Sequence, residues 1–176
     1  QALAEGAGYS SPILATVHGE RQLVVWTTES LSGLDPVTGK TRWRVPITVP
    51  ADMVVSTPVL VGEQLLVAGM MFRFAPDRTE PELEWPRDGK LLARVLSVTS
   101  TAHLDEGFVY SPRLTGEFMC LEAATGRQVW STNIVTDLKS GASVHVTPTG
   151  KSVLLFTDRG ELIHAGLSSK GYRELA

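Results

Sequence analysis

The stretch of sequence that decides the fold is residues 34–43, which read Leu-Asp-Pro-Val-Thr-Gly-Lys-Thr-Arg-Trp. Its core returns at residues 121–130 as Leu-Glu-Ala-Ala-Thr-Gly-Arg-Gln-Val-Trp. The shared pattern is leucine, an acid, two variable residues, Thr-Gly, a basic residue, two variable residues and tryptophan. The acid ends a strand, Thr-Gly forms a tight turn because glycine readily adopts a positive φ, and the basic residue opens the next strand. We expect each tryptophan ring to pack between neighbouring sheets.

Two landmarks repeat along the chain with one period. The first is an aromatic residue that recurs after 42, 45 and 42 residues, at Trp43, Trp85, Trp130 and Tyr172. The second is a short segment led by Ser or Thr that recurs after 46, 44 and 42 residues, at residues 11–14, 57–60, 101–104 and 143–146. Tryptophans scattered through an ordinary core would not share their spacing with a second motif. The sequence therefore predicts four copies of one structural unit.

Each unit holds short apolar runs rich in β-branched and aromatic residues, bounded by turn signals such as His18-Gly19-Glu20. No window shows sustained helical periodicity. A unit of this length fits four short strands, which is the size of one propeller blade. The sequence predicts an all-β fold, a β-propeller of four four-stranded antiparallel blades in a single domain, residues 1–176. We place the blades roughly at residues 11–46, 56–88, 100–133 and 142–175.

Blade two departs from the pattern because it lacks the Thr-Gly turn. Residues 70–84 stand in its place and contain two prolines and charges of both signs. We expect Phe72 to Pro81 to project from the ring as a loop or an extended hairpin. Loops on a rigid scaffold often carry function, so this stretch is also a candidate for shaping a binding surface.

Composition limits the classes of partner and of covalent chemistry. The formal net charge of −3 and the pI near 5.8 offer no basic field for nucleic acid. No apolar run approaches the roughly 18 residues that a membrane-spanning helix needs. Cys120 is the only cysteine, which excludes an intrachain disulfide and a thiolate metal cluster.

Residues 35–43 and 121–130 resemble the pyrroloquinoline-quinone-type (quinoprotein-like) propeller repeat, whose blade ends in Thr-Gly-Lys-x-x-Trp. The match is partial at Trp85 and Tyr172. Members of this family commonly have about six to eight blades, so four blades make about half a ring. The family includes quinone-dependent alcohol and glucose dehydrogenases and also cofactor-free relatives, among them a lipoprotein that helps assemble outer-membrane proteins. Family members usually carry export signals, which implies a periplasmic or extracellular location.

A quinone-dependent dehydrogenase is the enzymatic alternative. The resemblance implies that such an enzyme holds pyrroloquinoline quinone at the propeller centre, with a calcium ion, an Asp base and an Arg over the quinone oxygens. Calcium needs several converging oxygen ligands, whereas the acids here, such as Asp35, Glu63 and Asp105, lie mostly in turns. The adjacent cysteines of the alcohol enzymes are also absent. The sequence assigns no catalytic residue, cofactor-binding residue or metal ligand, and we expect no cofactor unless the chain is a segment of such a dehydrogenase.

His103 and His145 are the candidate site residues. They occupy equivalent positions on the first strand of blades three and four, 42 residues apart, and that strand lies innermost in this repeat. Two imidazoles close to the axis would share a metal or bind an anion near neutral pH. The alternative is that both are buried or channel-wall histidines bonded to backbone groups.

The function favoured by the sequence is a non-catalytic binding or scaffold module that contacts a protein, peptide or carbohydrate partner. The alternatives are a segment of the dehydrogenase described above and a degenerate propeller without a ligand. Four blades with the curvature of a larger ring leave two apolar end faces, more than a soluble monomer normally exposes. The chain would close as a four-bladed ring, or two copies would form an eight-bladed ring with two-fold symmetry, and we expect the homodimer.

Overall fold

The computed structural model describes residues 5–47, 54–87, 96–97, 99–113, 115–137 and 142–176. The described residues form sixteen strands and no helix. The strands pair into four four-stranded antiparallel sheets, each made of strands that follow one another in the sequence. This arrangement confirms the predicted all-β fold and the predicted blade of four strands. The strands lie inside the four predicted blade ranges, of which residues 88 and 114 are outside the described residues.

The strand bounds are as follows. Blade one contains β1 (Ile13–Val17), β2 (Glu20–Trp26), β3 (Ser30–Leu34) and β4 (Thr41–Pro46). Blade two contains β5 (Val59–Val61), β6 (Gln64–Val67), β7 (Met70–Arg73) and β8 (Glu82–Trp85). Blade three contains β9 (His103–Asp105), β10 (Phe108–Pro112), β11 (Phe118–Glu122) and β12 (Gln128–Thr132). Blade four contains β13 (Val144–Thr149), β14 (Ser152–Thr157), β15 (Leu162–Ser168) and β16 (Gly171–Glu174).

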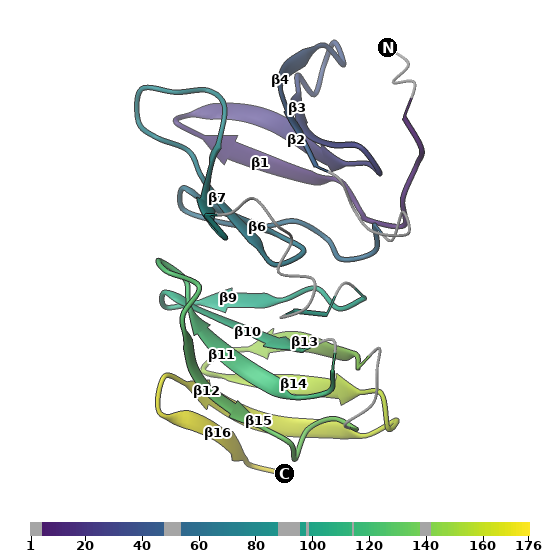
Figure 1. The fold of residues 1–176 in the computed structure, drawn as a ribbon, viewed down its shortest axis with the longest axis vertical. Coiled ribbons are helices and arrows are strands. Elements are labelled where there is room, and N and C mark those ends of the chain that lie inside the picture. The colour runs from purple at the N-terminus through teal and green to yellow at the C-terminus, as the bar shows by residue number, and fades with distance from the viewer. Residues whose placement is uncertain (1–4, 48–53, 88–95, 98, 114, 138–141) are drawn as a thin grey trace.

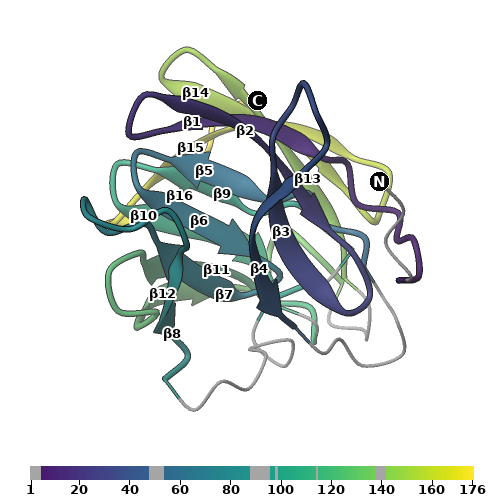
Figure 2. The same cartoon turned by 90° about the horizontal axis from the view of Figure 1, so that it is seen from above.

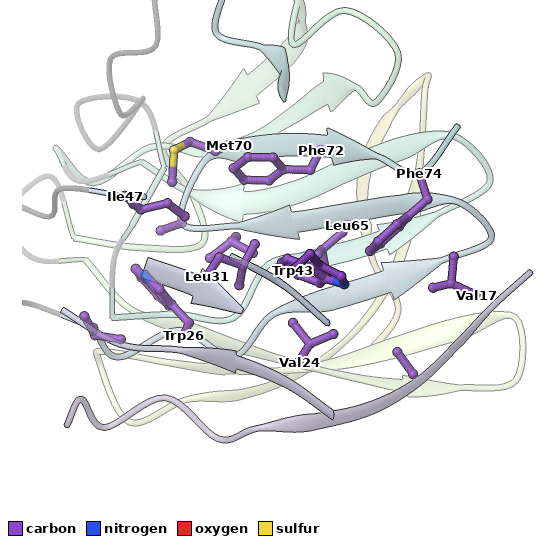
Figure 3. Close-up of a cluster of buried hydrophobic side chains, with 14 residues drawn as sticks. Val17, Val24, Trp26, Leu31, Trp43, Ile47, Leu65, Met70, Phe72 and Phe74 are labelled. Atoms are coloured by element: carbon purple, nitrogen blue, oxygen red, sulfur yellow. The ribbon is translucent and has the colours of Figure 1, made fainter. Parts of the chain in front are cut away.

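The four blades follow one another in space as they do in the sequence, with blade one at one end of the molecule and blade four at the other (Figure 1). A view turned by 90° shows the sheets lying over one another (Figure 2). A separate apolar core lies between each neighbouring pair of blades. The first of these cores joins Val24, Leu31 and Trp43 of blade one to Leu65 and Phe72 of blade two (Figure 3). Each blade is therefore stabilised mainly by the blades beside it.

Side chains alternate between the two faces of a sheet, so each blade presents one row to the blade before it and one to the blade after it. We call these the backward row and the forward row. The backward rows are Leu14-Leu23-Leu34, Leu60-Leu65-Phe72, Leu104-Val109-Leu121 and Val146-Leu155-Ile163. The forward rows are Ile13-Val24-Gly33, Val59-Leu66-Met71, His103-Tyr110-Cys120 and His145-Phe156-Leu162.

Residues 5–10 form no strand and cover part of the backward face of blade one. The Glu5 carboxylate accepts hydrogen bonds from the hydroxyls of Thr27 and Ser30 and pairs with Arg44 at 2.7 Å. The hydrogen bond from Thr27, together with those from Ser30 and Arg44, lowers the pKa of Glu5. Ser30 is therefore fully buried although its side chain points away from blade two.

Both Thr-Gly turns form as the motif predicts. Gly39 and Gly126 have φ values of 70° and 71°. The N–H of each glycine donates to the carbonyl of the acid that opens the turn, to Asp35 at 2.9 Å and to Glu122 at 2.8 Å. In blade one, the Arg42 guanidinium donates to the Asp35 carboxylate and lowers its pKa. The acid is therefore part of the turn.

The expected projection of Phe72 to Pro81 is wrong at its first residues. Phe72 and Phe74 are 2% and 0% exposed and belong to the core between blades one and two. Phe72 lies within β7, and apolar burial holds both rings against blade one. The exposed part is the loop at residues 76–80, between β7 and β8. The stretch is thus a hairpin with a long connection, and only that connection projects.

Candidate functional site: a cleft between blades one and two

The two predicted histidines lie at equivalent positions, at the heads of the forward rows of blades three and four. His103 faces blade four and is half-buried, and its ring stacks on Tyr110 with 6.0 Å between centroids. His145 is exposed on the opposite face of blade four. The sheet of blade four therefore separates the two rings, and the structure does not bring them together. Within the described ranges, no three His, Cys, Asp or Glu side chains are placed to hold a metal ion.

The forward row of blade three carries no charge at neutral pH. Burial lowers the pKa of His103, an effect that the nearby Asp105 carboxylate only partly opposes. Burial raises the pKa of the Cys120 thiol to about 11 and also raises the pKa of Tyr110. Because the thiolate is the nucleophilic form of cysteine, Cys120 is a core residue rather than a reactive one.

The tryptophan that ends a blade reaches into the next blade. The Trp85 indole N–H donates to the Ala123 carbonyl in the Thr-Gly turn of blade three, at 2.7 Å. The Trp130 indole N–H donates to the Ser168 carbonyl before β16 of blade four, at 2.8 Å. Gly126 lies so close to the Trp85 ring that an added Cβ would stand 2.9 Å from it. We call the bond from the tryptophan of one blade to the carbonyl at the last turn of the next blade the tryptophan lock, since it joins two successive blades.

The lock is missing between blades one and two, where the long connection from Arg73 to Glu82 replaces the short turn found before the last strand of blades three and four. The Trp43 indole N–H donates instead to the side-chain oxygen of Gln22 in its own blade, at 2.6 Å. The Trp43 ring packs edge-on against Phe74, with centroids 5.7 Å apart (Figure 3). His18 Nε2 donates to the Ala75 carbonyl at 2.9 Å and ties the β7–β8 loop to the β1–β2 turn. Figure 1 shows this loop reaching from β7 to the end of the β1–β2 hairpin.

A cleft of about 220 Å³ lies where the lock is missing. Its walls come from the β1–β2 hairpin, from β4 and from the β7–β8 loop. The apolar part of the lining is Val17, Trp43 and Pro76, and the polar part is His18, Glu20, Gln22, Arg42, Asp77, Arg78 and Thr79. The cleft therefore combines a buried aromatic floor with a rim that carries both charge signs.

Both arginines of the cleft already have carboxylate partners. Arg42 pairs with Glu20 at 3.0 Å and with Asp35 at 2.7 Å. Arg78 pairs with Glu82 along the loop. Their positive charges are therefore largely compensated before any ligand arrives.

Two polar groups of the cleft have unused bonding capacity. Asp77 makes no ion pair within the described part of the chain. Gln22 is only 4% exposed, and its oxygen is taken by Trp43. Its Nε2 amide donates to no group in residues 5–47 or elsewhere among the described ranges. This amide nitrogen is not one of the described buried atoms that lack a partner, so it is open to the cleft, where the acceptor of a ligand can take the place of water. The sequence pointed to the loop but not to Gln22, for which the absent Thr-Gly turn opposite Trp43 was the only signal.

A family model described as outer membrane protein assembly factor BamB matches residues 1–132 and, in a second alignment, residues 82–170. This chain belongs to the BamB-like family. Overlapping alignments are expected of a repeat protein, because one blade fits several positions of the family pattern. The match confirms the predicted resemblance to the pyrroloquinoline-quinone-like propeller repeat. No curated protein matches the chain.

Solved structures confirm the propeller fold of this BamB-like chain. BamB from Moraxella catarrhalis is 16% identical with a TM-score of 0.64, over 100% of this chain and 49% of that chain. The β-propeller domain of Cps50 (Swd1) from Myceliophteria thermophila is 14% identical with a TM-score of 0.56, over 94% and 56% of the two chains. Quinohemoprotein alcohol dehydrogenase ADHIIG from Pseudomonas putida HK5 is 14% identical with a TM-score of 0.53, over 89% and 29%.

These likenesses establish the fold, since their identities are too low to carry a function. The BamB-like chain spans about half the length of the Moraxella catarrhalis BamB structure. The described residues contain no helix that is both long and apolar enough to cross a membrane.

Proposed function

We propose that this chain is a non-catalytic binding module that contacts a protein partner during outer-membrane protein assembly. The observation that carries the proposal is the family match, which extends over most of the chain and is described as an outer membrane protein assembly factor. A periplasmic location follows from the same proposal. The β7–β8 loop supports it, because this loop stands exposed on a rigid pair of blades, where binding residues are commonly found.

Site-specific photo-crosslinking in the cells that make the protein tests this proposal. A photoreactive amino acid at Thr79 places the probe on the β7–β8 loop, and one at Glu29 places it on the exposed β2–β3 turn at the opposite edge of the blades. We expect adducts with proteins of outer-membrane assembly at Thr79 and several-fold fewer at Glu29. Equal labelling at both positions, or adducts with unrelated proteins alone, would contradict the proposal.

A segment of a quinone-dependent dehydrogenase is the rival function. It requires residues that hold pyrroloquinoline quinone and calcium. Among the described residues, no cluster of three or more acidic side chains converges as calcium binding requires. Titration of the chain with pyrroloquinoline quinone and calcium, followed by dye reduction with alcohols and aldose sugars, separates the two functions. Stoichiometric binding with turnover would overturn the binding-module proposal.

Two blade faces have no neighbouring blade among the described residues, the forward face of blade four and the backward face of blade one. We propose that a second copy of the chain covers both. Phe156 and Leu162 of blade four are 51% and 65% exposed, whereas Tyr110 and Cys120 at the same row positions of blade three are 3% and 0% exposed. Leu14 in the backward row of blade one is likewise 53% exposed. The two open rows are a forward and a backward row, which is the pairing found at every interface inside the chain. Two copies joined at both ends would give an eight-bladed ring with two-fold symmetry.

Light scattering tests the ring, and we expect a mass of about twice 19.0 kDa. Phe156→Glu would place a carboxylate in the new interface and is expected to yield the single-chain mass, because burying an unpaired charge costs several kcal/mol. Val37→Glu is the matched control, since Val37 is 92% exposed in a turn outside both rows. A wild-type mass near 19.0 kDa at high micromolar concentration would rule the dimer out.

A further inference from the structure

Gln22 is the polar group that points to a ligand for the cleft between blades one and two. It is 4% exposed, it lines the cleft, and its oxygen accepts from the Trp43 indole. The Nε2 amide is thus oriented with two donors and with no acceptor among the described residues. Because this amide is open to the cleft, a group that displaces water from it must bring an acceptor in exchange.

The second requirement comes from the rim. Asp77 has no ion-pair partner in the described part of the chain, whereas Arg42 and Arg78 are both paired with carboxylates. Among the charged groups of the rim, Asp77 is therefore the one whose carboxylate is available to accept from a ligand. A ligand that satisfies both groups of this cleft must offer an acceptor to Gln22 and a donor to Asp77.

We propose that this cleft binds a carboxamide side chain, glutamine or asparagine, of the protein partner; the inference rests on the proposed function, which makes that partner a protein. The carboxamide oxygen accepts from Gln22, and the carboxamide NH₂ donates to the Asp77 carboxylate. A carboxylate side chain would satisfy Gln22 but would be repelled by Asp77 and Glu20. A lysine side chain would pair with Asp77 but would leave the Gln22 donors without an acceptor.

The size and rigidity of the cleft fit a single side chain. Its volume of about 220 Å³ lies below the roughly 300–1,000 Å³ of sites for whole small molecules. Val17 and Pro76 provide apolar contact for the methylene groups of the side chain. The bond from His18 to the Ala75 carbonyl holds the loop against blade one, so the site is formed before the ligand arrives.

An NMR titration of the full chain with three capped tripeptides tests the inference. The peptides are acetyl-Gly-X-Gly-amide with glutamine, glutamate or methionine at X, which share their caps and backbone. The reporter is the indole N–H signal of Trp43, because that group donates directly to Gln22. We expect the glutamine peptide to shift this signal saturably with an affinity about tenfold higher than the other two, the effect of one hydrogen bond to a charged group. The indole signals of Trp85 and Trp130 should stay in place.

Two loop variants separate the site from general loop effects. Asp77→Asn removes the rim carboxylate without touching the core and is expected to weaken binding of the glutamine peptide about tenfold. Glu80→Gln makes the same chemical change on an exposed loop residue outside the cleft lining and should leave the affinity unchanged. Equal affinities for the three peptides, or equal losses in the two variants, would overturn the inference.

The two proposals fail in different ways. Crosslinks at Thr79 to an assembly protein, together with an unmoved Trp43 signal, would overturn the carboxamide site and leave the proposed function standing. Selective binding of the glutamine peptide without such crosslinks would support the site and contradict the proposed function.

Discussion

Replacing Trp85 by alanine is expected to lower the free energy of unfolding by about 3–5 kcal/mol, the cost of emptying a buried aromatic site. Trp85 is 4% exposed and packs in the core shared by blades two and three. Its indole N–H also donates to Ala123 across the blade boundary. The variant therefore loses a ring, a hydrogen bond and the contact with the Thr-Gly turn at once. Urea unfolding measures the change, and the backbone signal in circular dichroism is followed instead of tryptophan fluorescence because the variant lacks one tryptophan.

Trp85→Phe separates the two parts of the lock. It keeps an aromatic ring over Gly126 but removes the indole donor, and the Ala123 carbonyl keeps only the longer bond from Gln64 Nε2 at 3.4 Å. We therefore expect a loss of about 1–2 kcal/mol for the lost hydrogen bond and the smaller ring. A loss below about 1 kcal/mol for Trp85→Ala would show that the ring does not hold the blades together.

The sequence predicted the strands because their signals are local. Alternation of apolar and polar residues, Thr-Gly turns and a repeated spacing are written within each blade, and neighbouring copies reinforce them. Asp35 and Gly39 form the turn that the motif requires, and the same turn returns at Glu122 and Gly126. The equivalence of His103 and His145 followed from the same register.

The repeat did not predict how close those two histidines lie to each other, because their separation depends on which face of a strand meets the next blade. The repeat puts both rings in forward rows, and successive forward rows are separated by a whole sheet. An equal position in two blades therefore means equal surroundings rather than contact. His145 is exposed only because no described blade follows it.

The cleft could not be predicted from the sequence either, because it also depends on a contact between two blades. Its origin is a contact that blade two does not make, since the long β7–β8 connection replaces the short turn whose carbonyl would accept from Trp43, as happens for Trp85 and Trp130. Phe74 fills part of that space from a stretch whose prolines and charges predicted an exposed loop. Long-range burial overrode the local signal there. The missing motif marked the position of the site but not the residues that line it.

Gly126→Ala is expected to lower the free energy of unfolding by about 2–5 kcal/mol, and Gly39→Ala by only about 1–2 kcal/mol. Both glycines occupy the same turn with φ near 70°, so an alanine pays the same left-handed penalty of about 1–2 kcal/mol at each position. The positions differ in what the new Cβ would meet. At Gly126 it would stand 2.9 Å from the Trp85 ring, whereas at Gly39 it would meet no atom within 4 Å.

The difference between these two variants isolates the tryptophan lock from the turn itself. Overpacking against a buried ring costs about 1–3 kcal/mol, and that cost falls on Gly126→Ala alone. Urea unfolding at low micromolar concentration measures both variants under conditions that disfavour association. The double variant Trp85→Ala with Gly126→Ala gives the coupling, because removing the ring opens space for the new methyl group. If the lock holds blades two and three together, Gly126→Ala should cost no more than Gly39→Ala once Trp85 is gone. An undiminished cost in the Trp85→Ala background would place the strain in the turn and contradict the lock.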